Sequence, residues 1–280
     1  MVILKKPINK IAILHDMCGI GKAALTNVMP VLSIMGIECC PIPTLILSTH
    51  TGGFGKPVIR YNVQFIEDSI NHYKENNISF DGIFIGYLGT REILRSTKKF
   101  ITNFNKPKII LFDPICGDSG KLYSNFNKEY VEDLKELIKL SDIITPNFTE
   151  ACLLTNKQIK TTATLEEVEE IAKDLVRLGA KNVIITSLPA KEGEIGIAIY
   201  RSDLDEFSII SHKKEKKSYP GTGDIFAAVL LGNIINGLSV EMSVEKASKF
   251  VLDCVRESNK YNYPTKEGVL LEKCLHKILN

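Results

Sequence analysis

The amino-acid sequence predicts an α/β fold with a mostly parallel central sheet and an antiparallel hairpin at one edge. Short runs of apolar, often β-branched residues alternate with longer segments of helical spacing, as in β–α–β units joined by right-handed crossovers. The apolar runs are nearly continuous, which is typical of strands that are buried on both faces. Two alternating segments near residue 200 predict the hairpin.

Six apolar runs are predicted as buried strands: Lys10–His15, Ile37–Pro41, Gly82–Gly86, Lys108–Asp113, Ile143–Thr145 and Asn182–Thr186. Four segments between them have helical spacing: Ala23–Met35, Val63–Glu75, Lys128–Leu140 and Leu165–Leu178. The last of these follows Thr164, and Glu167 comes three residues later, which is a capping-box signature. Gly179 supplies a C-terminal stop for this helix.

The pattern changes after Thr186. Glu194–Tyr200 and Glu206–Ser211 predict the edge hairpin, and three helices then end the sequence: Thr222–Ile235, Val240–Glu257 and Lys266–Leu279. The sequence contains no internal repeat and no Pro/Gly/Ser-rich linker. We therefore expect residues 1–280 to form a single domain.

Composition and charge exclude several classes of protein. The 35 Lys and Arg residues nearly balance 33 Asp and Glu residues, so a nucleic-acid-binding surface is not expected. The seven cysteines form no CxxC pair, which favours reduced thiols over disulfides or a zinc site. No apolar run has the length of a membrane span, and no signal peptide is recognisable. These features predict a cytoplasmic protein without a membrane partner.

Residues suited to ligand binding gather where the predicted strands end. In open parallel sheets, ligands bind at the carboxyl ends of the strands. The segments that follow the predicted strands hold most of the Gly-rich and functionally suggestive residues of the sequence. They contain no P-loop motif, and their glycines lack the spacing of a dinucleotide fingerprint. A P-loop enzyme and a Rossmann oxidoreductase are therefore disfavoured.

The segment Pro220–Asp224 precedes an apolar helix and contains Gly221 and Gly223. Its glycines allow several backbone N–H groups to point the same way at a helix N-terminus, where the dipole favours an anion. Asp224 lies in the first turn of that helix. The alternative interpretation is that Asp224 only caps the helix and the glycines only form a turn.

Three further carboxylates are expected at the same edge of the sheet. Asp113 ends one strand and Asp118 follows it, while Asn147 and Glu150 begin a helix directly after the next strand. Such a group of acids needs a cation nearby, and oxygen ligands beside a phosphate are what Mg²⁺ prefers. On sequence alone, Glu150 could equally serve only the dipole of its helix.

These residues resemble the ribokinase-like superfamily of small-molecule kinases and, within it, the pyridoxal/pyridoxamine kinase branch. The resemblance is carried by motifs in the expected order between residues 10 and 235: Ala24–Thr44, Leu47–Gly52, Gly86–Gly89, Asp113–Tyr123, Ile144–Ala151 and Gly221–Asp224. It implies a three-layer α/β/α fold. It also implies ATP-dependent phosphorylation of the 5′-hydroxymethyl group of a vitamin B6 vitamer, which is pyridoxal, pyridoxamine or pyridoxine.

The resemblance assigns expected roles to individual residues. Asp224 would be the general base, and Gly221, Thr222 and Gly223 would form the anion hole. Asp118 and Glu150 would hold Mg²⁺, and a set of further residues would bind the nucleotide: Asp113, Thr145, Asn147, Thr186 and Ser187. The acceptor would contact another set: Asp16, Leu45, Leu47, His50, Thr51 and Tyr87. ATP and Mg²⁺ are the expected cofactors, a monovalent cation such as K⁺ remains open, and relatives are often homodimers.

Two departures from the family pattern leave the acceptor open. Better-known pyridoxal kinases carry a serine where this sequence has Asp16, and a related branch carries Asn-Asp where this sequence has His15-Asp16. Hydroxymethylpyrimidine kinase of thiamine synthesis is therefore an alternative, as is a non-catalytic regulator that binds a vitamer or nucleotide. The basic run His212–Lys217 is either a solvated loop or a lid over ATP.

Overall fold

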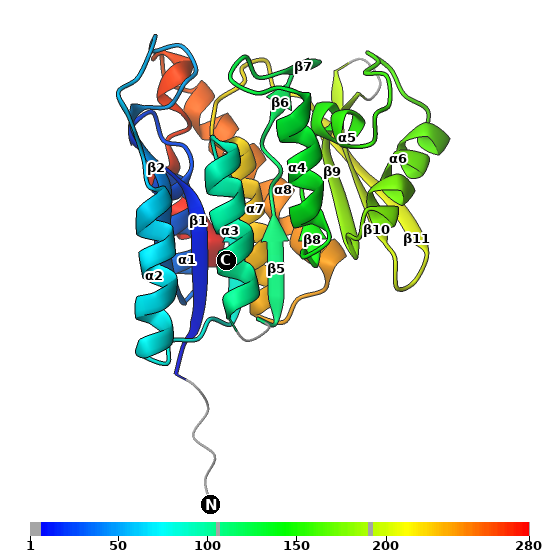
Figure 1. The fold of residues 1–280 in the computed structure, drawn as a ribbon. Helices are drawn as coiled ribbons and strands as arrows, with labels where there is room; N and C mark the ends of the chain where they lie inside the picture. Colours follow the sequence, from blue (N-terminus) through cyan, green and yellow to red (C-terminus); the bar gives the residue numbers. More distant parts are fainter. Residues whose placement is uncertain (1–6, 105–106, 190–192, 280) are drawn as a thin grey trace, which may run out of the picture.

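The computed structural model describes residues 7–104, 107–189 and 193–279, and a nine-stranded sheet runs through them (Figure 1). Its strands lie across the sheet in this order: β11 (Glu206–Lys213), β10 (Glu194–Arg201), β9 (Asn182–Pro189), β8 (Ile143–Ile144), β5 (Ile109–Phe112), β4 (Gly82–Ile85), β1 (Asn9–Ile20), β2 (Ile37–Thr49) and β3 (Ile59–Tyr61). The neighbours from β9 to β2 pair in parallel, and the pairs at both edges are antiparallel.

Helices cover both faces of this sheet. One face carries α2 (Val63–Glu75), α3 (Arg91–Asn103), α4 (Lys128–Ile138), α5 (Phe148–Leu154) and α6 (Leu165–Arg177). The opposite face carries α1 (Leu25–Ile34), α7 (Thr222–Ile235) and α8 (Val240–Asn259). Figure 1 shows the two helical layers in front of and behind the sheet. The predicted α/β/α fold, with its mostly parallel sheet and antiparallel edge hairpin, is confirmed.

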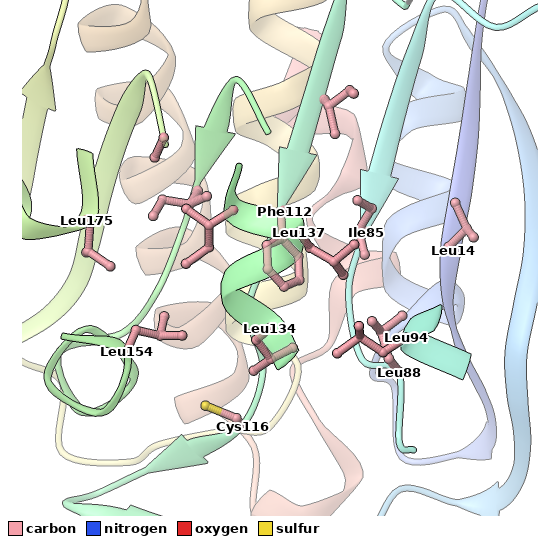
Figure 2. Close-up of a cluster of buried hydrophobic side chains, with 14 of the residues drawn as sticks. Leu14, Ile85, Leu88, Leu94, Phe112, Cys116, Leu134, Leu137, Leu154 and Leu175 are labelled. Atoms are coloured by element: carbon pink, nitrogen blue, oxygen red, sulfur yellow. The ribbon is translucent and has the colours of Figure 1, made fainter. Parts of the chain in front are cut away.

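Alternate residues of the central strands enter two separate hydrophobic cores, which explains why these strands read as continuous apolar runs. Leu14 of β1, Ile85 of β4 and Phe112 of β5 face the first helical layer, and Phe112 lies beside Leu137 of α4 (Figure 2). Their sequence neighbours enter the core on the other face.

Helices α5 and α6 each begin with a capping box. Thr164 accepts a hydrogen bond from the N–H of Glu167, whose carboxylate accepts one from the N–H of Thr164. Asn147 and Glu150 form a second capping box at the start of α5. The first is the predicted box; the second gives Glu150 a structural role in addition to any role in ligand binding.

The prediction for the C-terminal segment was wrong. Instead of a helix over Lys266–Leu279, the chain forms three short 3₁₀ turns at Thr265–Glu267, Leu271–Lys273 and Leu275–Leu279. Gly268 breaks the helical pattern with φ of 78°, because the backbone passes close to the β1–α1 turn here. A Cβ on Gly268 would lie 2.9 Å from the Cβ of Lys22.

Several elements were not predicted. β1 and β2 extend to Ile20 and Thr49, so residues expected in loops lie in strands. The pairing of β1 with β2 is irregular between His15 and Met17, which interrupts the alternation that marks a strand. Helix α3, edge strand β3 and the small hairpin of β6 (Gly117–Asp118) and β7 (Lys121–Leu122) were also missed.

Candidate active site

A cleft of about 490 Å³ opens at the carboxyl ends of the parallel strands. Sixteen of the seventeen residues predicted for the site line it: Asp16, Leu47, His50, Thr51, Tyr87, Asp113, Asp118, Thr145, Asn147, Glu150, Thr186, Ser187, Gly221, Thr222, Gly223 and Asp224. These residues come from β1, β2, β6, β9, α5, α7 and the segments that follow the strands. The rule that ligand sites form at this edge of a parallel sheet thus identifies the region.

Leu45 does not line the cleft. Its side chain is 2% exposed and belongs to the hydrophobic core beside β2. A Cβ on Gly89 would lie 2.9 Å from a methyl group of Leu45, so the two residues are in close contact. Leu45 therefore supports the wall of the cleft from behind, while Leu47 faces the cleft itself.

The N-terminus of α7 forms the floor of the cleft. Its N-cap residue Gly221 has φ of 78°, in the left-handed region that favours glycine. The Asn27 amide nitrogen donates to the carbonyl oxygens of Lys22, at 2.7 Å, and of Gly221, at 3.2 Å. Asn27 thereby ties the β1–α1 turn to the turn before α7. The segment Gly221–Gly223 faces the cleft at a helix N-terminus, as an anion site requires.

The Asp224 carboxylate is held by two groups that sequence reasoning did not assign to the site. Its Oδ2 accepts a hydrogen bond of 2.6 Å from the N–H of Ala24. Its Oδ1 lies 3.0 Å from Nε2 of His15. Asp224 is 8% exposed, and His15 is 1% exposed. Ala24 adopts φ of 58°, which is unusual for a residue with a side chain and aims its N–H at the carboxylate.

Asp113 is a buried acid in the same cleft. Burial raises the pKa of Asp113 to about 7, and the negative charge of Asp224 acts in the same direction. The positive charge of His15 opposes this shift. An acid whose pKa is higher in the folded state than in the unfolded chain destabilises the fold once the pH exceeds its unfolded pKa.

We expect the Asp113→Asn substitution to stabilise the protein increasingly as the pH rises. Between about pH 4 and pH 7, the wild-type carboxyl loses its proton in the unfolded chain before it does so in the fold. The gain in the free energy of unfolding should therefore grow from pH 5 to pH 8 and reach the order of 4 kcal/mol. Urea denaturation at pH 5 and pH 8, without nucleotide, measures this gain. A gain of the same size at both pH values would contradict the raised pKa of Asp113.

The Glu150 carboxylate is almost fully engaged with the backbone. One oxygen accepts hydrogen bonds from the N–H groups of Cys116, at 3.0 Å, and Gly117, at 3.4 Å, and the other accepts one of 2.8 Å from the N–H of Asn147. Burial and the nearby Asp113 raise the pKa of Glu150 well above its ordinary value, although these hydrogen bonds oppose the shift. Asp118 is exposed and faces the same cleft.

A complete metal centre is not built from protein side chains: within the described residues, no group of three or more His, Cys, Asp or Glu side chains could hold a metal ion. Mg²⁺ commonly takes one or two carboxylates together with water and substrate phosphates. The exposed carboxylate of Asp118 fits that pattern. Because the backbone already occupies Glu150, Asp118 is the better placed of the two predicted ligands.

The predicted acceptor side of the cleft combines one aromatic ring with a fixed histidine. Tyr87 is half-buried, and its hydroxyl accepts a 2.8 Å hydrogen bond from the side chain of Asn125. His50 uses both ring nitrogens internally: Nε2 lies 2.6 Å from the carbonyl oxygen of Lys266, and Nδ1 accepts from the N–H of Gly52 at 3.0 Å. His50 therefore anchors this wall of the cleft to the C-terminal segment.

Several residues of the cleft were missed, among them His15, Ala23, Ala24, Ile115, Tyr123, Ser218, Tyr219 and Phe226. Most of them have apolar or aromatic side chains or face the cleft with their backbone. In a sequence, such residues look the same as core or loop residues. His15 carried a usable signal, because it directly precedes Asp16 at the end of an apolar run. Its contact with Asp224 joins residues 209 positions apart, which no local pattern reveals.

The basic run His212–Lys217 is only partly a loop. His212 and Lys213 end strand β11, and Glu215 lies 2.9 Å from Nε of Arg256 in α8. None of the described residues that line the cleft is a lysine or arginine. Ser218, next to the run, does line the cleft.

Comparisons with known proteins agree with this geometry. The profile of the phosphomethylpyrimidine kinase family matches residues 29–269 of this chain. The chain belongs to that family. It is therefore a kinase, which transfers a phosphoryl group, and the resemblance to pyridoxal kinases is confirmed by several relatives. In the described part of the chain, no helix has the length and apolar character to cross a membrane.

Relatives with both kinds of acceptor resemble the chain. A hydroxymethylpyrimidine/phosphomethylpyrimidine kinase of Aquifex aeolicus is 30% identical over 64% of this chain and 68% of its own length. A pyridoxal kinase of Dictyostelium discoideum is 30% identical over 81% of this chain and 79% of its own. A crystal structure with pyridoxal, of a Bacteroides thetaiotaomicron protein assigned to the phosphomethylpyrimidine kinases, is 36% identical, covers 98% of this chain and 96% of its own, and gives a TM-score of 0.94.

Proposed function

We propose that this kinase uses ATP to phosphorylate the 5′-hydroxymethyl group of a vitamin B6 vitamer, with residues 1–280 acting as one domain. The observation that carries the proposal is the position of Asp224, beside the amide-lined turn Gly221–Gly223 and within the same cleft as Tyr87. The pyridoxal-bound structure of a relative that matches nearly the whole chain supports the choice of acceptor.

The chemistry follows from the positions of these groups. Asp224 takes the proton of the acceptor hydroxyl as its oxygen attacks the γ-phosphorus of ATP, and the bond to the β-phosphate oxygen breaks. The N–H groups of Gly221, Thr222 and Gly223 stabilise the negative charge on the transferred group. The N–H of Ala24 fixes the orientation of the Asp224 carboxylate. A non-catalytic regulator would need no base held in this way.

The remaining charges of the cleft suit a magnesium nucleotide. When bound, Mg²⁺ would offset the charge of the phosphates, and Asp118 would hold it with Glu150 nearby. Asp113, Thr145, Asn147, Thr186 and Ser187 line the side of the cleft that we assign to the nucleotide. A bound K⁺, a homodimer and a cytoplasmic location stay predictions.

A second candidate function is phosphorylation of hydroxymethylpyrimidine. The family profile and the Aquifex relative favour it, and the same base and anion site would serve. Initial rates of ADP release with Mg·ATP and pyridoxal, pyridoxamine, pyridoxine or hydroxymethylpyrimidine separate the two candidates. We expect a higher kcat/KM for at least one B6 vitamer than for the pyrimidine. Turnover of the pyrimidine alone would replace the proposed acceptor, and turnover of none would reject both.

We further propose that Lys214, Lys216 and Lys217 add positive potential over bound ATP, because the described lining of the cleft has no lysine or arginine. Replacing all three with serine should raise KM for ATP by about three- to tenfold at low salt, with little change in KM for the vitamer. The matched control replaces Lys98, Lys99 and Lys139, which form ion pairs with Glu136 of α4 and Glu67 of α2. An equal rise in KM for ATP in the two triple variants would contradict the proposal that Lys214, Lys216 and Lys217 cover bound ATP.

A further inference from the structure

His15 is a buried residue of the cleft to which the proposed reaction assigns no role. It lies where the pairing of β1 with β2 becomes irregular, between His15 and Met17. Both His15 and its neighbour Asp16 line the cleft. Irregular strand pairing next to an active site commonly redirects side chains toward the ligand. His15 is therefore a candidate for a functional role in this cleft.

Each ring nitrogen of His15 faces a carboxylate. Nδ1 lies 2.8 Å from Oδ1 of Asp16, and Nε2 lies 3.0 Å from Oδ1 of Asp224. The ring occupies the space that a side chain at position 86 would need, since a Cβ on Gly86 would lie 2.1 Å from it. The edge of the Phe84 ring packs against it as well, with the two ring centroids 6.0 Å apart. The imidazole is thus fixed in the plane that joins the two carboxylates.

Acidic side chains surround His15. The carboxylates of Asp16, Asp113, Asp224 and Glu150 are each at most 8% exposed and share this cleft. Cys18, whose thiol donates to Oδ2 of Asp16 at 3.1 Å, and Tyr87 also face this region. Four more ionisable residues line the same cleft: His50, Asp118, Tyr123 and Tyr219. Carboxylates gathered out of water need a cation to remain ionised together. His15 contacts two of them and can supply that charge.

Burial alone would lower the pKa of His15. The hydrogen bonds to Asp16 and Asp224 and their negative charges outweigh it and raise the pKa to about 10. A competing arrangement exists, because the N–H groups of Asp16 and Tyr87 lie 2.9 and 3.3 Å from Nδ1. In a neutral ring, Nδ1 would accept from these amides while Nε2 donates to Asp224. The two arrangements differ in the charge of the ring, which can be measured.

We propose that His15 is a positioning residue that carries a positive charge and holds the Asp224 carboxylate ionised and oriented toward the acceptor hydroxyl. This inference rests on the proposed role of Asp224 as general base. His15 exchanges no proton with the substrate. It also joins Asp224 to Asp16, so the base and the acceptor end of the cleft share one rigid unit.

The pH dependence of kcat/KM tests this role, with His15→Gln as the variant. Glutamine is neutral, so Asp224 would lose its cationic partner. The acidic limb of the pH profile should then move to higher pH by about one to three units, and activity at pH 7 should fall accordingly. His72→Gln is the control for replacing a histidine, because His72 lies on α2, does not line the cleft and hydrogen-bonds the side chain of Asn76. An unchanged acidic limb in His15→Gln would overturn the proposal.

NMR of the wild-type protein provides a test that requires no folded variant at position 15. With ¹⁵N-labelled histidine, the His15 ring should show the doubly protonated form from pH 6 to pH 9. Its signals are assigned by elimination with variants of the four other histidines. A neutral ring at pH 7 would overturn the proposal. If the ring is charged but the wild-type protein phosphorylates no acceptor, the proposed function fails and the charge of His15 stands.

Discussion

Replacing Asp224 with asparagine should lower kcat by about 10²- to 10⁴-fold, the range that a positioned general base contributes. Asparagine keeps the size of the side chain and an oxygen for the N–H of Ala24, but it cannot accept the proton of the acceptor hydroxyl. The dissociation constant for ATP should change little, because Gly221–Gly223 and the nucleotide side of the cleft remain. Steady-state kinetics and calorimetric titration with ATP measure the two effects.

Asp142→Asn is the matched control for this substitution. The Asp142 carboxylate also accepts a backbone hydrogen bond, from the N–H of Ile110 at 2.9 Å. Asp142 directly precedes strand β8, so it lies at the amino ends of the parallel strands, away from the cleft. This variant should lose stability and keep its kcat. Wild-type turnover in Asp224→Asn would show that another group accepts the proton.

Replacing Gly221 with alanine should have the second large effect. The positive φ of Gly221 already disfavours a side chain, and an added Cβ would lie 2.4 Å from both the Asn27 amide nitrogen and the Lys22 carbonyl oxygen. No real contact is that short, so the N-terminus of α7 must move away from the β1–α1 turn. Because the anion site and Asp224 lie on that turn of helix, kcat/KM should fall by about 10²-fold or more.

Gly237→Ala separates the effect of this collision from backbone strain. Gly237 follows α7 with φ of 93°, but a Cβ there would meet no atom within 4 Å. Its substitution should cost about 1 kcal/mol of stability and leave kcat/KM unchanged. Thermal melts and initial rates of both variants make the comparison. If the two variants lose the same activity, the close packing around Gly221 is not what aligns the anion site.

The sequence predicts most of the sheet because its signal is local. Buried strands such as Gly82–Ile85 are short apolar runs, and the α6 start is marked by Thr164 and Glu167. Helix α3 was missed although its signal is also local: Thr90 caps it, and apolar residues recur at helical spacing from Ile93 onward. The C-terminal 3₁₀ turns could not be predicted, because their path depends on contact between Gly268 and a turn more than 240 residues earlier.

The same distinction holds for the cleft. The ends of parallel strands meet at one edge of a sheet, so polar residues at Asp113, Thr145 and Thr186 could be grouped from the sequence alone. The hydrogen-bond partners of Asp224 could not be predicted in this way. Ala24 contributes a backbone N–H in an unusual conformation, and His15 reaches Asp224 across the sheet edge. Leu45 and Leu47 lie two residues apart in β2 and point to the same side of the strand, but only Leu47 lines the cleft, a difference that the sequence does not show.

The most direct test of the central claim is to identify the phosphorylated product. The protein is incubated with Mg·ATP and each B6 vitamer, and the products are analysed by mass spectrometry and ³¹P NMR. We expect one phosphate per vitamer, attached through the 5′-hydroxymethyl oxygen and formed in equal amount to ADP, and we expect Asp224→Asn to form it at least about 10²-fold more slowly. ADP release without a phosphorylated vitamer, or a phosphate on another oxygen, would contradict the proposed function.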